Sequence, residues 1–317
     1  MDSQKDGVGH VKMKALNVEA GSERFPISKD VYPPRTASWR NNLTALSQRR
    51  NILFTACSHQ IYVWCPSGRL QLLNSTPEMI ITPVLKEPRA TGYISPVSPH
   101  SINHIICDDL GTEEVLLFAT DSGNVSAYHV EAICSALERA AELDEPRRPL
   151  DGSDIQPFFA EYVGRSAWGL AIHKFARLIA VSANTHDITV FAFGLVDPSG
   201  HQESGADRGI LEEAGEGYRD YYGQSWEVID SSRKLHDLRL QGSRKRSRNL
   251  RLTYIGHETN IPSISFLNTD IEPNGEWMVS ADIDNVMIVW SVWSLLTPYR
   301  VHGVRDINDG LLPPQFE

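Results

Sequence analysis

A short block that occurs four times along the chain sets the strongest constraint on its fold. In each copy an apolar strand ends in a small polar turn, and a second strand then closes on an aromatic residue. The copies cover residues 52–64, 114–128, 177–191 and 276–290. Their closing aromatic residues are Trp64, Tyr128, Phe191 and Trp290. Self-similarity of this kind indicates a repeat architecture, in which each repeat packs against its neighbours.

Further short apolar strands flank these blocks. One precedes each block, at residues 43–46, 102–106, 167–172 and 261–266. Candidate outer strands follow the first three, at residues 69–73, 158–163 and 250–255, and the fourth block has no clear outer strand. A strand, a hairpin and an outer strand together form one blade of a β-propeller. We therefore predict an all-β fold: a partial WD-type β-propeller of about four blades, with one short helix and a long disordered insertion.

The same pattern predicts the domain organisation. Residues 1–36 form an N-terminal extension, and residues 37–293 form the partial propeller. The blades are expected at about residues 37–73, 101–163, 166–255 and 257–293, and residues 294–317 form a tail with an incomplete blade. The closing aromatics are further apart than the roughly 40–45 residues of a plain WD repeat, so insertions must separate the blades.

The fourth block indicates the type of blade. Gly256 and His257 precede it, and Ser280, Asp284 and Trp290 fall where a WD repeat places its hydrogen-bonded polar residues. An imidazole, a hydroxyl, a carboxylate and an indole N–H can satisfy one another when buried. We therefore predict a structural tetrad of His257, Ser280, Asp284 and Trp290. The other blades lack most of this set and are expected to rely on apolar packing.

Three insertions separate the blades. Residues 74–100 are too rich in proline for a central strand. The segment from Val130 to Leu143 places Ile133 and Leu137 on one face and predicts a short helix. Residues 197–249 are polar and glycine-rich, so they are predicted to be disordered.

The last insertion carries a basic run. Its cationic residues are Arg244, Lys245, Arg246 and Arg248, and the acidic half of the same insertion precedes them. A flexible basic cluster can be recognised by nuclear import receptors or can contact phosphates. A solvated loop that balances the neighbouring acidic residues is the alternative. We interpret the run as a candidate nuclear import signal and expect a nuclear location, with the cytoplasm as a further location.

Composition excludes several classes of function. The formal net charge is −10 and the isoelectric point is about 5.6, so direct binding of nucleic acid is not expected. No apolar stretch approaches the length of a membrane helix, and no signal peptide is apparent at the N-terminus. The cysteines are Cys57, Cys65, Cys107 and Cys134 and show no CxxC spacing. We expect no membrane contact, no metal and no cofactor.

Enzyme motifs are also absent from the sequence. The segment Gly164-Arg-Ser-Ala-Trp-Gly169 is not a G-x-S-x-G nucleophile elbow, and there is no phosphate-binding glycine loop. His100 and His104 could suggest a metal site with Asp108 and Asp109. Residues four apart on a strand lie about 13 Å apart, however, too far to share one ion. No catalytic residue is predicted.

Several longer stretches resemble a known family. They are residues 38–47, residues 92–104 with the sequence Gly-Tyr-Ile-Ser-Pro-Val-Ser-Pro-His-Ser-Ile-Asn-His, and residues 108–117, 166–173 and 177–185. Together they resemble the fungal regulators named for constitutive ribonucleotide reductase transcription, over about residues 32–195 and 252–293. The resemblance implies a nuclear WD-type protein that influences transcription of ribonucleotide reductase genes in the response to DNA damage and replication stress.

This resemblance sets the functional expectation. We expect a non-enzymatic protein-interaction scaffold whose partners are transcription regulators. The alternative, also implied by the family, is a substrate receptor of a cullin-type ubiquitin ligase that binds a ligase adaptor. A propeller enzyme with a site in its central channel is a further alternative, but only isolated acidic and histidine candidates are present. Family members are much longer, so a missing C-terminal part or a partner is expected to complete the propeller.

Overall fold

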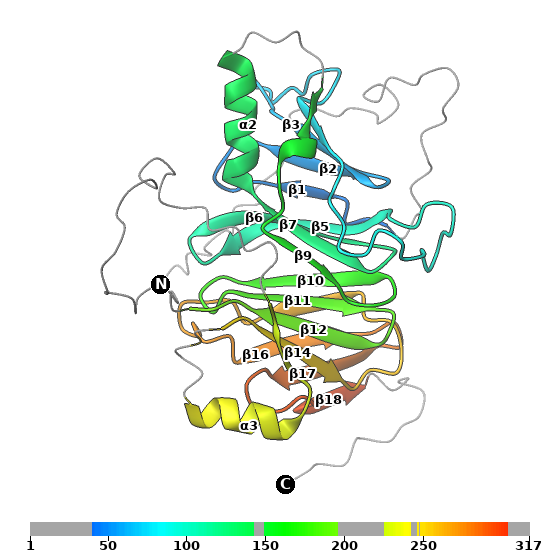
Figure 1. Ribbon diagram of the computed structural model, residues 1–317, viewed down its shortest axis with the longest axis vertical. Coiled ribbons are helices and arrows are strands. Elements are labelled where there is room, and N and C mark those ends of the chain that lie inside the picture. The colour runs from blue at the N-terminus through cyan, green and yellow to red at the C-terminus, as the bar shows by residue number, and fades with distance from the viewer. Residues whose placement is uncertain (1–39, 143–148, 196–224, 242–245, 247, 304–317) are drawn as a thin grey trace, which may run out of the picture.

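Four β-sheets follow one another along the chain and stack along the long axis of the molecule (Figure 1). The computed structural model describes residues 40–142, 149–195, 225–241, 246 and 248–303. Each sheet is one blade, and the first and fourth blades lie at opposite ends of the stack (Figure 1). The described part is therefore an open arc. The predicted all-β fold, a partial propeller of about four blades, is confirmed.

Blade 1 is a five-stranded sheet. Its strands, in sheet order, are β1 (Thr44–Leu46), β2 (Leu53–Cys57), β3 (Gln60–Trp64), β4 (Met79–Ile81) and β8 (Leu150–Asp151). β8 pairs parallel to β4, and the short 3₁₀ turn η1 (Gly152–Asp154) follows it. The outer strand predicted at residues 69–73 is not found there. Gly68 and Gln71 have φ angles of +68° and +51°, a left-handed turn that no strand can contain.

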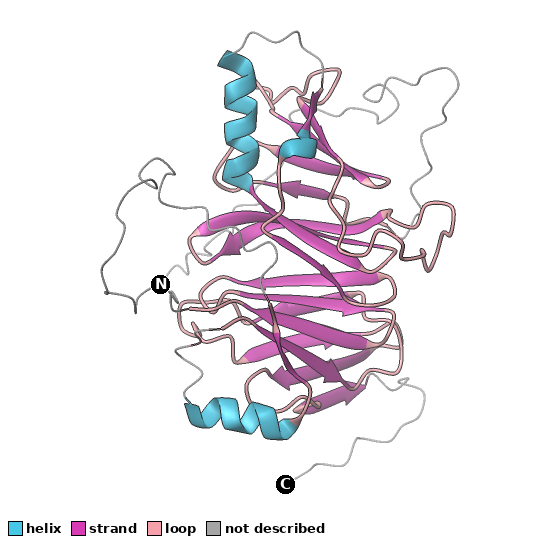
Figure 2. Cartoon of the chain, in the orientation of Figure 1, coloured by secondary structure: helices cyan, strands magenta, loops and turns pink. Residues whose placement is uncertain are grey.

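Blade 2 continues with four antiparallel strands and a helix. The strands are β5 (Ile102–Leu110), β6 (Glu113–Thr120), β7 (Asn124–His129) and β9 (Phe159–Tyr162). Between β7 and β9 lies α2 (Val130–Glu142), which stands beside blade 1 (Figure 2). The helix buries Val130, Ile133 and Cys134, on the apolar face that the sequence predicted.

Blade 3 contains the part of the long insertion that the structure describes. Its strands, in sheet order, are β10 (Ala167–His173), β11 (Leu178–Ala183), β12 (Asp187–Ala192), β14 (Leu250–Ile255) and β13 (Glu227–Ile229). β13 pairs parallel to β14, and α3 (Ser232–Gln241) follows it. The prediction of disorder for residues 197–249 is therefore wrong for residues 225–241. Two isolated buried residues, Ile229 and Leu235, anchor this segment without producing a sustained apolar period.

Blade 4 is a complete four-stranded sheet. Its strands are β15 (Ser263–Phe266), β16 (Trp277–Ala281), β17 (Val286–Ser291) and β18 (Arg300–Gly303). The sequence did not indicate β18, which lies in the segment predicted as a tail with an incomplete blade. All four residues of β18 are exposed, so the strand carries no apolar pattern.

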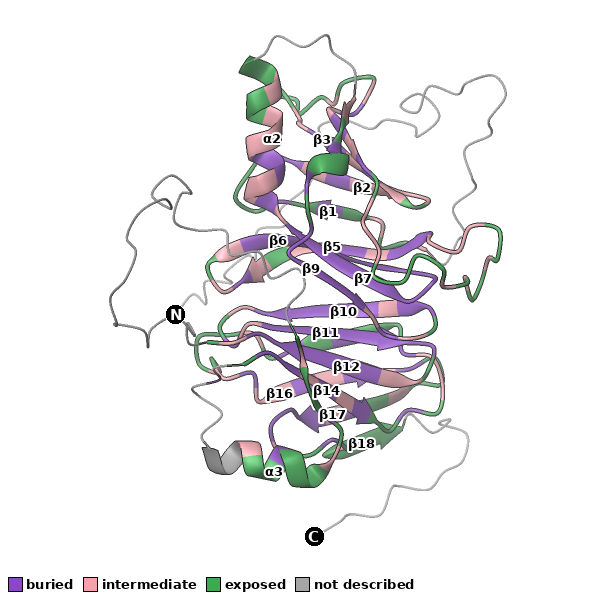
Figure 3. Ribbon diagram, in the orientation of Figure 1, coloured by how far each residue is buried: buried purple, intermediate pink, exposed green. Residues whose placement is uncertain are grey.

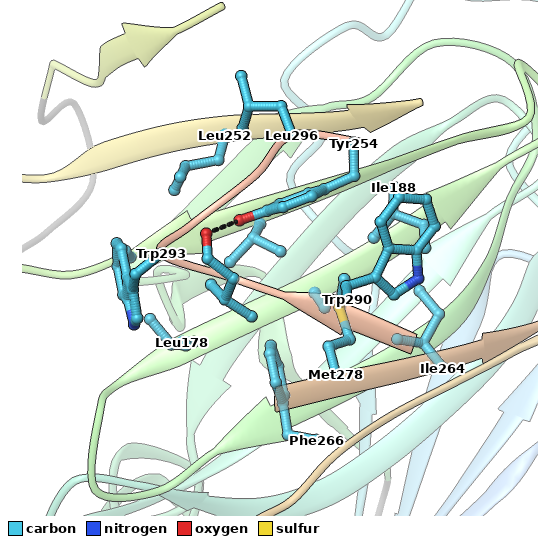
Figure 4. Close-up of a cluster of buried hydrophobic side chains, with 14 of the residues drawn as sticks. Leu178, Ile188, Leu252, Tyr254, Ile264, Phe266, Met278, Trp290, Trp293 and Leu296 are labelled. Carbon is cyan, nitrogen blue, oxygen red and sulfur yellow. Dashed lines mark hydrogen bonds between the residues drawn. The ribbon is translucent and has the colours of Figure 1, made fainter. Parts of the chain in front are cut away.

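Three apolar clusters fill the junctions between consecutive blades. The middle strands β6, β7, β11 and β12 are buried along almost their whole length (Figure 3). The cluster between blades 3 and 4 includes Tyr254 and Trp290, and the hydroxyl of Tyr254 donates to the carbonyl of Val292 at 2.6 Å (Figure 4). Burying one large apolar side chain contributes about 1.5–3 kcal/mol, so these junctions hold the stack together. No helix in the described ranges is long and apolar enough to cross a membrane.

Candidate functional site: a pinned loop and the polar links between blades

A chain of hydrogen bonds joins the loop after β14 to the hairpin of blade 4. His257 lies in this loop, and its Nδ1 is 2.8 Å from Oδ2 of Asp282. Its Nε2 is 2.7 Å from Oγ of Ser280. The indole N–H of Trp290 donates to the same Oγ at 2.8 Å. When Nδ1 carries the proton, each group donates once along the chain, from Trp290 through Ser280 and His257 to the carboxylate.

The carboxylate of this tetrad is Asp282, and its assignment to Asp284 is corrected. Asp282 is the first residue after β16 and is buried, whereas Asp284 is exposed in the turn. The other oxygen of Asp282, Oδ1, accepts the backbone N–H groups of Asp284 at 3.0 Å and of Val286 at 2.9 Å. The carboxylate of Asp282 thus closes the turn with one oxygen and binds the imidazole with the other. It can do both because Asp282 lies directly at the end of β16.

The surroundings of Asp282 favour its charged form. Burial acts to raise the pKa of this carboxyl, but the hydrogen bonds from His257 and from the amides of Val286 and Asp284 outweigh it. The pKa of Asp282 is therefore lowered from its ordinary value. The carboxylate remains ionised in the folded protein and supports a short, charge-assisted hydrogen bond with the imidazole.

The other blades keep only parts of this arrangement. In blade 1 the indole N–H of Trp64 donates to Oγ1 of Thr55 at 2.9 Å, which repeats the link between Trp290 and Ser280. In blades 2 and 3 the hydroxyl position is apolar. Phe118 occupies it in blade 2 and stacks on Tyr128, with ring centroids 6.2 Å apart. Apolar packing replaces the polar chain there.

Blade 2 has a different polar link, centred on Asp121. Asp121 is the first residue after β6, the position that Asp282 has after β16, and it is fully buried. Its Oδ1 accepts the hydroxyl of Ser166 from blade 3 at 2.7 Å. Its Oδ2 accepts the backbone N–H groups of Ile94 at 2.9 Å and Ser95 at 3.1 Å. In the sequence, Asp121 lies in the polar turn of the block at residues 114–128 and carries no other signal. Alignment of the four turns would have singled it out.

These bonds fix the conformation of residues 92–100, which form the pinned loop. A side chain at Gly92 would come within 2.3 Å of the carbonyl oxygen of Ser95, so the turn requires glycine. At the far end of the loop, Nδ1 of His100 is 2.9 Å from Oγ of Ser122. The loop nevertheless exposes apolar side chains: Tyr93 is 53% exposed and Val97 is 92% exposed. A fixed backbone that presents apolar side chains is typical of a binding surface.

The two histidines considered for a metal have separate partners. His100 bonds to Ser122 and to the carbonyl of Pro88, whereas Nδ1 of His104 lies 2.9 Å from the carbonyl of Trp168. Burial lowers the pKa of His104, despite that hydrogen bond. Among the residues that the structure describes, no group of three or more His, Cys, Asp or Glu side chains is placed to hold a metal ion.

One residue of the basic run has a structural position. Arg246 is 5% exposed, and its guanidinium donates to the carbonyls of Ala176 and Phe193 and lies 4.7 Å from the ring centroid of Trp293. Burial, with a smaller contribution from the charge of Arg177, lowers its pKa to about 10, so it stays charged at neutral pH. Arg248 is exposed, and Arg244 and Lys245 lie outside the described residues. In the folded chain Arg246 is not accessible to an import receptor.

Comparison with known proteins identifies the family. The CRT10 family model matches residues 34–289, a stretch that runs through blades 1 to 3 and ends within β17 of blade 4. The chain belongs to the CRT10 family. An uncharacterised WD repeat-containing protein of Schizosaccharomyces pombe is 24% identical over 279 residues, which are 85% of this chain and 44% of the relative. The chain thus spans less than half the length of this curated relative.

The CRT10 family and the WD repeat-containing relative support a protein-interaction role of the WD-repeat type. Among solved structures, a chain in the crystal structure of the mitotic checkpoint complex is similar, with a TM-score of 0.42 and 11% identity. That likeness covers 93% of this chain and 62% of the other.

Proposed function

We propose that this CRT10-family chain is a non-enzymatic scaffold that docks transcription regulators and thereby controls ribonucleotide reductase genes during DNA damage and replication stress. The family match, which runs from blade 1 into β17 of blade 4, supports the process, because the family is named for transcription of these genes. The pinned loop supports the mode of action. Interfaces depend on a few aromatic and aliphatic anchors, and Tyr93 and Val97 offer such anchors without a cost for ordering the loop.

One observation supports the docking role: the backbone of the pinned loop is held by a buried side chain, while its apolar side chains are exposed. Asp121, a fully buried carboxylate, holds two loop amides, although burial of an ionised group is costly. A loop that served only as a connection would not need this anchor, and its apolar side chains would pack inward. Here the anchor fixes the backbone, and Tyr93, Ile94 and Val97 face solvent. These are the properties of a preorganised contact surface.

The test compares strains that carry the gene deletion, a Tyr93→Ser/Val97→Ser double variant, or the control variant Val228→Ser. Val228 lies on β13 and is 48% exposed, away from the loop. Transcripts of the ribonucleotide reductase genes are quantified with and without an inhibitor of that enzyme. We expect the double variant to reproduce the effect of the deletion and the control to match the wild type. Unchanged transcript levels in the deletion strain would refute the regulatory role. Wild-type transcript levels in the double variant would refute the role of the pinned loop in docking.

Nuclear location is a separate part of this proposal, supported by the basic residues around Arg248. Because Arg246 is buried, we propose that the remaining basic residues, not the run of four as a whole, carry any import signal. A fusion of residues 231–251 carrying Arg246→Ala to a fluorescent reporter tests this. Nuclear accumulation is expected, and a diffuse cytoplasmic signal would contradict it.

A further inference from the structure

We infer that the pinned loop binds an acidic, hydrophobic segment of a partner protein, in which aspartate or glutamate alternates with aliphatic or aromatic residues. The exposed apolar side chains of the loop contact the hydrophobic residues of this segment. Two exposed arginines beside the loop, Arg89 and Arg165, bind its carboxylates. The inference names the chemistry of the partner at the proposed docking site, and it therefore rests on the proposed function.

The segment just before the pinned loop is held on a fixed backbone and leads into the loop that projects beside blade 2 (Figure 1). Fully buried Asn124 binds Glu87 twice: its Nδ2 donates to the Glu87 carbonyl at 3.0 Å, and its Oδ1 accepts the Glu87 N–H at 2.7 Å. At the end of the loop, Nε2 of His100 lies 3.1 Å from the carbonyl of Pro88. These contacts hold the segment against the end of the loop, so the exposed Arg89 lies directly beside it.

The second arginine comes from the connection between β9 and β10. Arg165 is exposed, and the next residue, Ser166, donates its hydroxyl to Oδ1 of Asp121 at 2.7 Å. The other oxygen of this carboxylate holds two amides of the pinned loop. The carbonyl of Arg165 accepts the N–H of Asn184 at 3.0 Å, which fixes the backbone at this position too. One buried carboxylate thus connects the neighbour of Arg165 to the pinned loop.

Both guanidinium groups are available to a partner. Among the described residues, no carboxylate forms an ion pair with Arg89 or Arg165. The one acid in residues 82–101 is Glu87, and its Oε1 accepts the backbone N–H of Arg89 at 3.3 Å. This surface is therefore locally basic, although the whole chain has a net charge of −10. Since a guanidinium can bind a carboxylate through two hydrogen bonds, arginine is well suited to this recognition.

A partner that matches this surface combines two chemistries. Tyr93, Ile94 and Val97 are 53%, 38% and 92% exposed and form an apolar centre with cations at its margin. Alternation of acidic and hydrophobic residues, which fits such a surface, is typical of disordered activation domains. A nucleic acid fits less well, because the net charge of −10 repels a polyanion and the aliphatic side chains offer no ring on which a base could stack.

Binding of two synthetic peptides to the 317-residue chain tests this chemistry. Both peptides carry the same leucine and phenylalanine residues, which alternate with aspartate in one and with lysine in the other. Fluorescence anisotropy of the labelled peptides gives the two Kd values. The aspartate peptide should bind about tenfold or more tightly, and a rise from about 50 to about 300 mM NaCl should weaken it about fivefold. Equal affinities, no binding of the aspartate peptide, or tighter binding of a single-stranded oligonucleotide would overturn the inference.

Charge reversal shows whether the two arginines carry the preference. The double variant Arg89→Glu/Arg165→Glu should bind the aspartate peptide about tenfold or more weakly and gain affinity for the lysine peptide, an exchange that damage to the fold cannot produce. The matched control is Arg69→Glu/Arg300→Glu, which changes the net charge equally at two exposed arginines, one in the turn after β3 and one on β18. It should alter either affinity by about twofold or less at physiological salt. Equal effects of the two double variants would overturn the inference.

Transcripts of the ribonucleotide reductase genes separate this inference from the proposed function. We expect Tyr93→Ser/Val97→Ser and Arg89→Glu/Arg165→Glu each to abolish the regulation. If only the first variant abolishes it, docking at the pinned loop stands, but the partner is not acidic and the inference fails. If both variants keep the regulation although the aspartate peptide binds, the proposed function fails and the binding chemistry stands.

Discussion

Blades 2 and 4 place an aspartate at the same point, directly after the second strand, but use it differently. In blade 4 Asp282 binds His257 from the preceding loop and closes its own hairpin. In blade 2 Asp121 binds Ser166 from the following blade and two amides of the pinned loop. Asp282 therefore stabilises its own blade, whereas Asp121 links blade 2 to blade 3 and to a surface loop. Blades 2 and 4 thus share a carboxylate with hydrogen-bond partners at the strand end, but the partners differ.

Blade 3 shows what happens at this position without a carboxylate. The first residue after β11 is Asn184, whose backbone N–H donates to the carbonyls of Arg165 and Ser166. Its buried side-chain oxygen has no hydrogen-bond partner among the described residues. The backbone contact thus remains while the side-chain link is absent. The apolar cluster shared with blade 2 and the bond from Ser166 to Asp121 hold the junction between blades 2 and 3.

The largest effect is expected for Asp121→Ala, which removes the acceptor of three hydrogen bonds. It would leave the amides of Ile94 and Ser95 and the hydroxyl of Ser166 without their partner, at about 1 kcal/mol each. We expect the free energy of unfolding, measured with urea, to fall by about 3 kcal/mol. Trypsin should also cleave more readily at the exposed Arg89, which lies three residues before the pinned loop.

The matched control is Asp270→Ala, at an exposed aspartate in the turn before β16. Its expected effect is within about 0.5 kcal/mol. If Asp121→Ala costs no more than this control, the link between blades 2 and 3 does not depend on the carboxylate, and the comparison with blade 4 fails.

A smaller effect is expected for Ser280→Ala, which tests the tetrad against the simpler pair in blade 1. Removal of the Ser280 hydroxyl leaves the indole N–H of Trp290 and Nε2 of His257 unpaired, so unfolding should become easier by about 2 kcal/mol. Thr55→Val removes the acceptor of Trp64 alone and should cost about 1 kcal/mol. Equal costs in urea unfolding would show that His257 adds nothing to the indole–hydroxyl pair.

Repetition in the sequence was sufficient to predict the fold, because each blade repeats strand, turn and aromatic closure. It did not predict β18, whose four residues are all exposed, or β13, which pairs with β14 and buries only Ile229 of its three residues. The pattern also misplaced the outer strand of blade 1, because the apolar residues at 69–73 lie in a left-handed turn. Edge strands depend largely on backbone hydrogen bonds, which the residue composition of a segment does not predict.

The polar links were less predictable than the fold. His257, Ser280 and Trp290 could be placed from the motif, but Asp282 and Asp284 are both acidic, and only the strand end distinguishes them. Arg246 looked like part of a solvated basic run because its partners, the carbonyls of Ala176 and Phe193, are distant in sequence. Local sequence patterns cannot predict contacts between residues 50 or more positions apart.

The smallest effect is a dependence on pH that distinguishes the two aspartates of the blade 4 hairpin. The pKa of Asp282 is lowered in the folded state, against the opposing effect of burial, by His257 and two backbone amides. A carboxyl with a lowered folded pKa stabilises the protein above its unfolded pKa of about 3.9, and this contribution is lost as the pH falls through the folded value. The difference in stability between the wild type and Asp282→Asn should thus be constant above about pH 5 and shrink below about pH 4. Urea midpoints at pH 7, 5, 4 and 3 measure it. Asp284→Asn, at the exposed neighbour, should give a difference near zero at every pH. If Asp284→Asn instead showed the pH-dependent loss and Asp282→Asn did not, the carboxylate of the tetrad would be Asp284.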